Sequence, residues 1–235
     1  MTGFSDGVIQ MPENERLLVI PGDDVTEAGM KAGLGTYKRE GKIFAAQLGI
    51  KNVRSGYVNV IPLAGRYMPR PGDSVIGTII ELGPSSWLVD VNSPYPAPLH
   101  VSDAPWKVEF GGTSQFLRTG DVVLAKILAV DEMRRTQLTM KEHGLRKLSG
   151  GQVIEISHSK VPRVIGKAGS MIGLLKEHTG CRMFVGQNGR IWIEGEIESM
   201  MKAVQAIRMI NEGAQHVGLT DAVRTFLTGQ DKGGV

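Results

Sequence analysis

Two clusters of proline and glycine interrupt the sequence and limit how far any helix or strand can run. The first is Pro69-Arg70-Pro71-Gly72-Asp73 and the second is Leu148-Ser149-Gly150-Gly151. Proline lacks a backbone donor and glycine favours turns, so regular structure is expected to stop at both clusters. The sequence therefore predicts three folded segments and a C-terminal segment with one short helix and a flexible tail: 1–70, 71–147, 148–213 and 214–235.

The first two segments carry patterns typical of β-structure. Segment 1–70 holds short apolar runs between turn residues and is expected to be a small all-β unit, with strands at 17–20, 42–48 and 57–61. Segment 71–147 holds five strand-like runs: 74–82, 87–91, 99–102, 121–130 and 136–140. Five short strands rich in β-branched residues predict a five-stranded barrel of the OB-fold type, which binds oligonucleotides on one face. The stretch 103–119 is expected to lie on the surface.

Segment 148–213 has the pattern of an α+β domain. A strand over 153–156 precedes a helix over 171–179, with Ser170 as its N-cap. Two strands, 182–187 and 190–194, are joined by Asn188-Gly189, a dipeptide typical of two-residue hairpin turns. A helix over 198–212 follows, with an apolar stripe of Met200, Met201, Val204, Ile207 and Ile210. The expected fold class is multidomain, mainly β with an α+β C-terminal domain.

Composition excludes several classes of protein. Hydrophobic residues make up 41% of the chain, which is enough for packed cores. The single cysteine, Cys181, excludes an internal disulfide framework and a zinc site with two or more thiolates. No apolar run reaches the roughly 20 residues that span a bilayer, and the first ten residues lack the pattern of a secretory signal. We therefore expect a cytoplasmic protein that makes no membrane contact.

Positive charge is concentrated in two stretches of a chain whose net charge is only +3. Residues 41–72 contain no acidic residue and hold Lys42, Lys51, Arg54, Arg66 and Arg70. Residues 156–176 contain no acidic residue either and hold Lys160, Arg163, Lys167 and Lys176. Such stretches are typical either of solvated surfaces or of contacts with nucleic acid or acidic protein. The second stretch surrounds a glycine pair, which favours binding there.

The glycine pair lies in Val164-Ile165-Gly166-Lys167-Ala168-Gly169-Ser170, just before the expected helix. Glycine lets a ligand approach the backbone closely, and a helix N-terminus offers free N–H groups. This loop is therefore suited to clamp a nucleic-acid backbone, and the alternative is an ordinary tight turn. The candidate contacts are Lys160, Arg163, Gly166, Lys167 and Gly169.

Two enzymatic interpretations of the glycines fail. A P-loop requires Ser or Thr after Gly-Lys, and Ala168 stands there. A dinucleotide fingerprint at Gly33-Leu34-Gly35 requires a third glycine where the chain has Lys38. The five histidines are scattered, and neither a nucleophile elbow nor a metal-ligand pattern occurs. We therefore expect no enzyme activity and no cofactor.

The expected barrel holds a second set of candidate RNA contacts: Trp87, His100, Lys126, Arg134 and Arg135. Aromatic rings stack on unpaired bases, and cations contact the phosphates. The alternative for Trp87 is a place in the core, and the alternative for His100 is a cap at a strand end. The sequence alone leaves both alternatives open.

Several stretches resemble known families. Segment 71–147 resembles the S1 RNA-binding domain at 72–79 (GDSVIGTI), 99–102 (LHVS), 120–127 (GDVVLAKI) and 137–141 (QLTMK). Residues 151–212 resemble a KH domain. The stretches 19–23 (VIPGD) and 33–37 (GLGTY) are similar to those of the exosome cap subunit of the ribosomal-RNA-processing protein four type. That family has the same order of N-terminal β unit, S1 and KH.

The resemblance implies a non-catalytic, RNA-binding exosome subunit, which we expect to be archaeal. It implies a trimeric cap, shared with other cap subunits, on a phosphorolytic ring of RNase PH-like fold, into which single-stranded RNA is threaded 3′ end first. It also implies that the N-terminal unit contacts the ring, for which Lys42, Lys51 and Arg54 are the docking candidates.

The chain departs from the S1 pattern in its second strand. The usual aromatic pair is reduced to Trp87, with Ser85 and Ser86 before it, which shifts the expected RNA contacts towards Lys and Arg. Two alternative functions stay open. One is a transcription or translation factor that joins S1 to KH, and the other is a nuclease in its own right.

Overall fold

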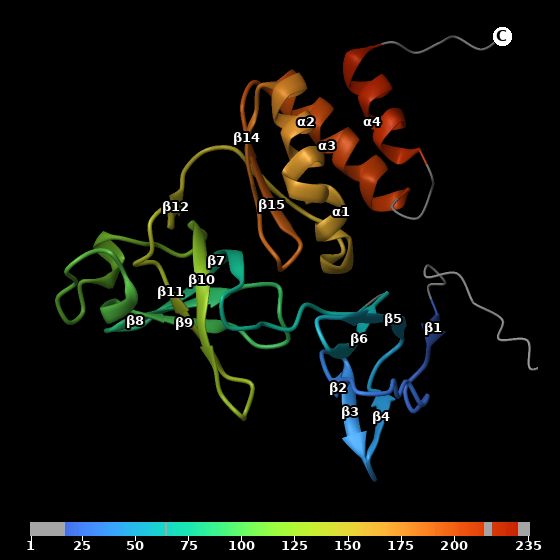
Figure 1. Cartoon of the computed structure of the whole chain (residues 1–235). Helices are drawn as coiled ribbons and strands as arrows, with labels where there is room; N and C mark the ends of the chain where they lie inside the picture. The colour runs from blue at the N-terminus through green and yellow to red at the C-terminus, as the bar shows by residue number, and fades with distance from the viewer. Residues whose placement is uncertain (1–16, 64, 214–217, 230–235) are drawn as a thin grey trace, which may run out of the picture. The chain divides into compact units, whose positions relative to one another are not determined.

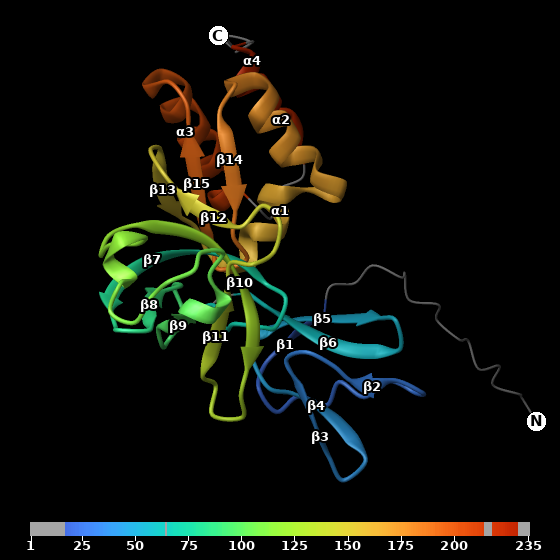
Figure 2. The same ribbon diagram turned by 90° about the vertical axis from the view of Figure 1, so that its left-hand side faces the viewer.

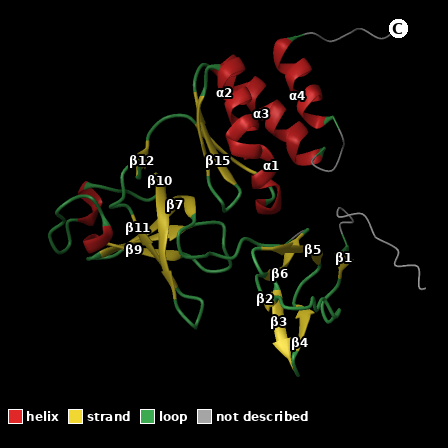
Figure 3. Cartoon of the chain, in the orientation of Figure 1, coloured by secondary structure: helices red, strands yellow, loops and turns green. Residues whose placement is uncertain are grey.

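The computed structural model describes residues 17–63, 65–213 and 218–229. The chain divides into two compact units, one ending at Gly65 and one beginning at Arg66 (Figure 1). The second unit contains a β-barrel and an α+β domain, and the α-helices of the described ranges all lie in the latter (Figure 3). None of these helices has the length and apolar character needed to cross a membrane.

The N-terminal unit is built of short strands, as its apolar runs predict. Its main sheet has the order β1 (Leu18–Val19), β5 (Gly49–Arg54), β6 (Tyr57–Pro62), β2 (Lys31–Ala32), and β3 (Thr36–Arg39) pairs with β4 (Lys42–Ala45). Strands β2, β3 and β5 lack an apolar run because most of their side chains are at least partly exposed. The core consists of Val19, Val25, Ile43, Ala45, Val58 and Val60.

The barrel has the five strands that the sequence predicts: β7 (Ser74–Leu82), β8 (Ser86–Asp90), β9 (Ala97–His100), β10 (Val122–Val130) and β11 (Thr136–Thr139). The order is β11-β9-β8-β7-β10, and β11 also pairs with β10, which closes the sheet. A short strand, β12 (Arg146–Leu148), adds to β10. Inward side chains such as Val75, Ile79 and Val123 fill the barrel.

The stretch between β9 and β10 completes the barrel core as well as covering its surface. It contains two 3₁₀ turns, η1 (Val101–Asp103) and η2 (Thr113–Gln115). Leu117 is fully buried, and Trp106 stacks on Phe116 with ring centroids 5.5 Å apart. Because these residues follow no strand or helix period, the sequence pattern does not predict their packing.

The α+β domain follows the predicted order. Strands β13 (Gln152–Glu155), β15 (Arg190–Glu194) and β14 (Arg182–Val185) form a sheet in that spatial order. Its helices lie on one face of this sheet (Figures 1 and 2): α1 (Val161–Ile165), α2 (Ser170–Thr179), α3 (Ile197–Glu212) and α4 (Leu219–Thr228). The turns η3 (His158–Lys160) and η4 (Lys167–Gly169) flank α1.

Two details of the helices differ from prediction. Ser170 is the first residue of α2, and Gly169, with a φ of +80°, is its N-cap. Met201 is 60% exposed, although it belongs to the predicted apolar stripe of α3. Ala203, which lies one turn before Ile207, is fully buried instead. The buried face of α3 therefore includes small residues, which a pattern of large apolar side chains does not reveal.

The connection between β14 and β15 is a four-residue loop, Gly186-Gln187-Asn188-Gly189, so the prediction of a two-residue turn is wrong. The Gly186 N–H donates to the Arg190 carbonyl (2.8 Å), and only Gly189 of the predicted dipeptide has a positive φ, +83°. Asn188 is fully buried, and its Nδ2 donates to the carbonyls of Ile76 (2.8 Å) and Val91 (2.9 Å) in the barrel. Contacts with the barrel thus override the local turn preference.

Further contacts fix the α+β domain to the barrel. The guanidinium of buried Arg190 binds the carboxylates of Asp90 (2.5 Å) and Glu155 (2.8 Å). Burial disfavours its charge, but the two carboxylates outweigh burial and raise the pKa of Arg190. The Gln187 N–H donates to the Ser74 carbonyl (2.9 Å). An apolar cluster completes the contact: Ile76, Leu124, Leu148 and Trp192.

Candidate nucleic-acid interface

The glycine loop between α1 and α2 has a backbone conformation that favours glycine. Gly166, Ala168 and Gly169 have φ values of +76°, +53° and +80°. A Cβ atom on Gly166 would lie 2.6 Å from the Met171 backbone nitrogen, so this position also needs glycine for space. A Cβ atom on Gly169 would make only an ordinary contact with Ile172 Cγ2 at 3.9 Å, so this position needs glycine for its conformation alone. The loop therefore exposes Lys167 and Ala168 immediately before α2.

Three cations lie in or beside this loop. Lys160 ends η3, Arg163 lies in α1, and Lys167 lies in the loop itself. Arg163 and Lys167 are exposed, Lys160 is half-buried, and none of the three forms an ion pair with a residue in the described part of the chain. We call these cations, together with Gly166 and Gly169, the glycine-loop surface. Its unpaired positive charge and the N-terminus of α2 are suited to phosphate groups.

Trp87 does not contribute to a surface. Its side chain is fully buried in the barrel core, where the indole Nε1 donates to the Thr113 carbonyl (3.2 Å). Its ring packs edge-on against Trp106, which belongs to the segment folded over this end of the barrel. A ring without an exposed face offers no surface for base stacking. The interpretation of Trp87 as an RNA contact is therefore wrong, and the core interpretation is confirmed.

His100 and Lys126 both have partners within the barrel. His100 is exposed at the end of β9, and its Nδ1 lies 2.7 Å from the Ser102 Oγ and accepts the Ser102 N–H. It thereby caps η1, in agreement with a capping role, while its ring stays accessible. Lys126 pairs with Glu142 at 2.7 Å, which neutralises its charge locally. Lys126 is therefore a weaker phosphate candidate than the cations of the glycine-loop surface.

The two arginines of the β10–β11 hairpin differ in their surroundings. Figures 1 and 2 show this hairpin extending from the barrel. Arg135 pairs with Asp131 at 2.8 Å, and the backbone N–H and side chain of Arg135 hold the pKa of Asp131 below its usual value. Arg134 is exposed and has no ion-pair partner among the described residues. Of the two, Arg134 is therefore the one available to an anion.

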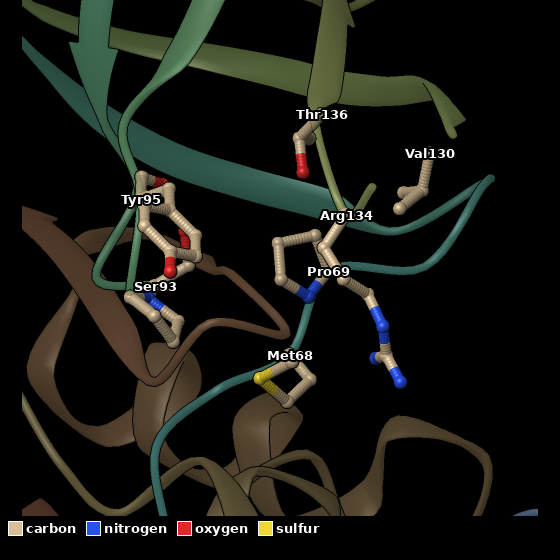
Figure 4. A pocket seen from close by; sticks show the side chains of 8 residues that line it. Met68, Pro69, Ser93, Tyr95, Val130, Arg134 and Thr136 are labelled. Carbon is tan, nitrogen blue, oxygen red and sulfur yellow. The ribbon is translucent and has the colours of Figure 1, made fainter. Parts of the chain in front are cut away.

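The structure adds Tyr95, which the sequence analysis does not single out. Tyr95 is 68% exposed in the loop between β8 and β9. Figure 4 shows it at a small hollow that Arg134 also lines, with Pro69 between the two side chains. The available sequence signal is Pro94-Tyr95-Pro96, because two prolines keep the tyrosine out of a paired strand.

Two of the three docking candidates in the N-terminal unit are paired internally. Lys42 lies 3.0 Å from Asp24, and Lys51 lies 2.6 Å from Glu27 with only 15% of its side chain exposed. The hydrogen bonds from the Thr26 hydroxyl and N–H, with Lys42, lower the pKa of Asp24 to about 2. These lysines are therefore less available to a partner than their sequence positions indicate.

Arg54 is exposed and makes no ion pair with the described residues. It lines a shallow hollow together with Leu34 and Tyr57. Leu34 is 54% exposed and Tyr57 is 44% exposed. Ile61, which lies on the same face of β6 as Tyr57, is 49% exposed. We call Leu34, Tyr57 and Ile61 the apolar patch. An apolar patch on a small unit is typical of a surface that contacts another protein.

Metal-ligating side chains do not gather in the described ranges: no group of three His, Cys, Asp or Glu side chains there is placed to hold a metal ion. Cys181 is a free, buried thiol in the short segment that joins α2 to β14.

Comparisons with known proteins agree with this architecture. Residues 16–64 match the family model of the exosome RNA binding protein RRP4 N-terminal domain, and residues 66–108 match the RRP4 S1 domain. Residues 151–199 match a KH domain. Each matched segment lies within one of the folded parts described above.

Two archaeal relatives and one solved structure resemble most of the chain. The exosome complex component Rrp4 of Thermoplasma volcanium is 48% identical over 89% of this chain and 89% of its own length. That of Methanosarcina acetivorans is 45% identical over 91% of this chain and 82% of its own. A crystal structure of a putative exosome complex RNA-binding protein, 40% identical, covers 71% of this chain and 97% of its own with a TM-score of 0.65. This chain belongs to the exosome complex component Rrp4 family.

Proposed function

We propose that this subunit is a non-catalytic RNA-binding component of the exosome, which captures single-stranded RNA and guides its 3′ end into a phosphorolytic RNase ring. The glycine-loop surface is the observation that carries the proposal. None of its three cations forms an ion pair with another described residue, and its glycines have backbone conformations that keep Lys167 and Ala168 exposed. Contacts of this kind neutralise phosphates and do not read bases, so binding tolerates many sequences and weakens steeply with salt.

The N-terminal unit is proposed to dock on the ring through the apolar patch and Arg54. The exposed Leu34, Tyr57 and Ile61 support this, because a docked partner would remove their apolar surface from water. Lys42 and Lys51 take a smaller share, since each already has a carboxylate partner. The assembly proposed is a cytoplasmic one, with three copies of cap subunits on ring subunits of RNase PH-like fold.

The test of RNA capture uses the full chain reconstituted with its ring subunits. Wild type is compared with a variant in which Lys160, Arg163 and Lys167 are changed to Gln. We expect the variant to assemble normally but to lose most RNA capture and to slow phosphorolysis of a long single strand. Unchanged capture and turnover in the variant would contradict the proposal.

The docking proposal has a matched pair of variants. Leu34→Ser with Tyr57→Ser is expected to abolish ring association while leaving the RNA affinity of the free chain intact. Lys42→Gln with Lys51→Gln is expected to have a smaller effect on ring association. A larger loss from the lysine pair than from the apolar pair would overturn the assignment of the apolar patch.

The proposal also predicts that the purified chain has no nuclease activity of its own. Labelled RNA incubated with the chain, phosphate and Mg²⁺ should keep its full length, and the ring subunits should be needed for shortening. Shortening by the chain alone, retained through further purification, would show that it is an enzyme.

A further inference from the structure

One hollow of the barrel is lined by an exposed aromatic side chain and by a cation that has no ion pair among the described residues. Tyr95 comes from the β8–β9 loop, and Arg134 comes from the β10–β11 hairpin, almost 40 residues further along the chain. Both line the hollow of Figure 4, whose other lining residues include Met68, Pro69 and Val130. An aromatic ring can stack on a base, and a guanidinium can bind a phosphate.

Tyr95 is held by its surroundings before any ligand arrives. Prolines at positions 94 and 96 fix the backbone on both sides, and the Ser93 Oγ donates to the Tyr95 carbonyl (2.6 Å). Asn92 anchors the start of this loop by donating to the carbonyl of buried Asn188 (3.1 Å). Because the backbone that carries the ring is already ordered, binding loses little backbone conformational entropy there.

Arg134 is also held at a position that disfavours its residue type. Its φ is +64°, in the left-handed region, and its N–H donates to the Asp131 carbonyl (3.0 Å) in a tight turn. Glycine is the residue that such a position favours. Asp131 is occupied by Arg135, so the Arg134 guanidinium is left without an ion pair among the described residues.

We propose that Tyr95 and Arg134 form a nucleotide subsite for single-stranded RNA, in which a base stacks on the tyrosine ring and the adjoining phosphate binds the guanidinium. The subsite rests on the proposed RNA-binding function and gives the barrel a stacking residue in place of buried Trp87. Single-stranded RNA fits better than a protein segment because ring and guanidinium match the two chemical parts of a nucleotide.

The test measures the affinity of the full chain for a fluorescent ten-nucleotide oligouridylate by anisotropy. Tyr95→Ala is expected to weaken binding about tenfold at every salt concentration, while Tyr95→Phe, which keeps the ring, stays within about twofold of wild type. Arg134→Gln is expected to weaken binding and to reduce the slope of log affinity against log salt by about 0.7. Phe110→Ala, which removes an 86% exposed ring outside the hollow, is the control and should change nothing.

The outcomes separate the subsite from the function on which it rests. If wild type binds and the Lys160, Arg163, Lys167 variant loses affinity while Tyr95→Ala does not, the subsite is rejected and the RNA-binding proposal stands. If wild type does not bind the oligonucleotide, both are rejected. Equal losses from Tyr95→Ala and Phe110→Ala would show non-specific apolar contact and would also overturn the subsite.

Discussion

Two loops of the α+β domain have the same glycine spacing and opposite surroundings. Gly166-Lys167-Ala168-Gly169 exposes its two central residues, carries a cation with no ion pair among the described residues and leads into α2. Gly186-Gln187-Asn188-Gly189 is pressed against the barrel, and its asparagine is fully buried. The residues between the glycines decide the difference: lysine and alanine leave the first loop open, whereas asparagine offers donors and an acceptor to barrel backbone groups. Glycine spacing alone therefore identifies neither loop as a ligand site.

The buried loop should show the largest effect on stability. Asn188→Ala leaves the Ile76 and Val91 carbonyls without their donor, so the free energy of unfolding is expected to fall by about 3 kcal/mol. Urea denaturation measures this, with Gln187→Ala as the control because that side chain is exposed. Equal stability of the Asn188 variant and wild type would contradict the claim that Asn188 holds the buried loop to the barrel.

The two glycines of the open loop are required for different reasons, and substitutions at Gly166 and Gly169 distinguish them. Gly166→Ala brings a Cβ against Met171 in addition to the strained φ, and is expected to cost about 2 kcal/mol or more. Gly169→Ala makes only an ordinary contact with Ile172 and is expected to cost about 1 kcal/mol from conformation alone. Thermal unfolding of the two variants ranks them, and a larger loss at Gly169 would contradict the geometry of the loop.

Cations of the open loop should affect RNA affinity without affecting stability. Lys167→Gln is expected to weaken binding of a single-stranded oligonucleotide about fivefold at 0.1 M salt, because one phosphate contact is lost. Lys126→Gln is the matched comparison and should have a smaller effect, since Lys126 is neutralised by Glu142. Titrations of both variants under the same conditions check the difference. A greater loss of RNA affinity for Lys126→Gln would indicate that the RNA site lies on the barrel and not on the loop.

The smallest expected effect concerns the ion pair between Asp121 and Lys147 of β12. Burial raises the pKa of Asp121, but hydrogen bonds from the Lys147 ammonium (2.5 Å) and the Arg118 N–H outweigh burial and lower it below 3.8. The stability from this carboxylate is therefore complete above pH 3.8 and is lost as the pH falls through the lowered value. When the pH is lowered from 5 to 2, the free energy of unfolding is expected to fall by about 0.5 kcal/mol less in Asp121→Asn than in wild type. Identical losses would show that the pair contributes nothing.

Much of the fold is predictable from sequence because its signals are local. The barrel strands are apolar runs rich in β-branched residues, and the order of elements in the α+β domain is marked by glycine at loop and helix ends. Strand β3 escapes prediction because its side chains are mostly exposed and it has no apolar period. The turn at Asn188 is mispredicted for another reason: its conformation is set by a barrel more than 90 residues earlier in the chain.

The candidate site is less predictable because it depends on which charges and rings remain free. The cations around Gly166 are identifiable, since no acidic residue lies nearby in the sequence. The pairing of Lys51 with Glu27 joins residues 24 apart, which no local pattern reveals. Burial of Trp87 depends on a segment that follows no period. Tyr95 is exposed because prolines on both sides keep it out of a strand, and a search for apolar strand patterns does not detect this.

The central claim is that the open glycine loop contacts RNA and the buried one does not. Amide chemical shifts of the isotopically labelled full chain, followed during titration with a short single-stranded RNA, test it residue by residue. We predict that the amides of Lys167, Ala168 and Gly169 shift progressively while those of Asn188 and Gly189 stay unchanged. Unchanged shifts at Lys167 to Gly169, in a chain that binds the RNA, would contradict the account.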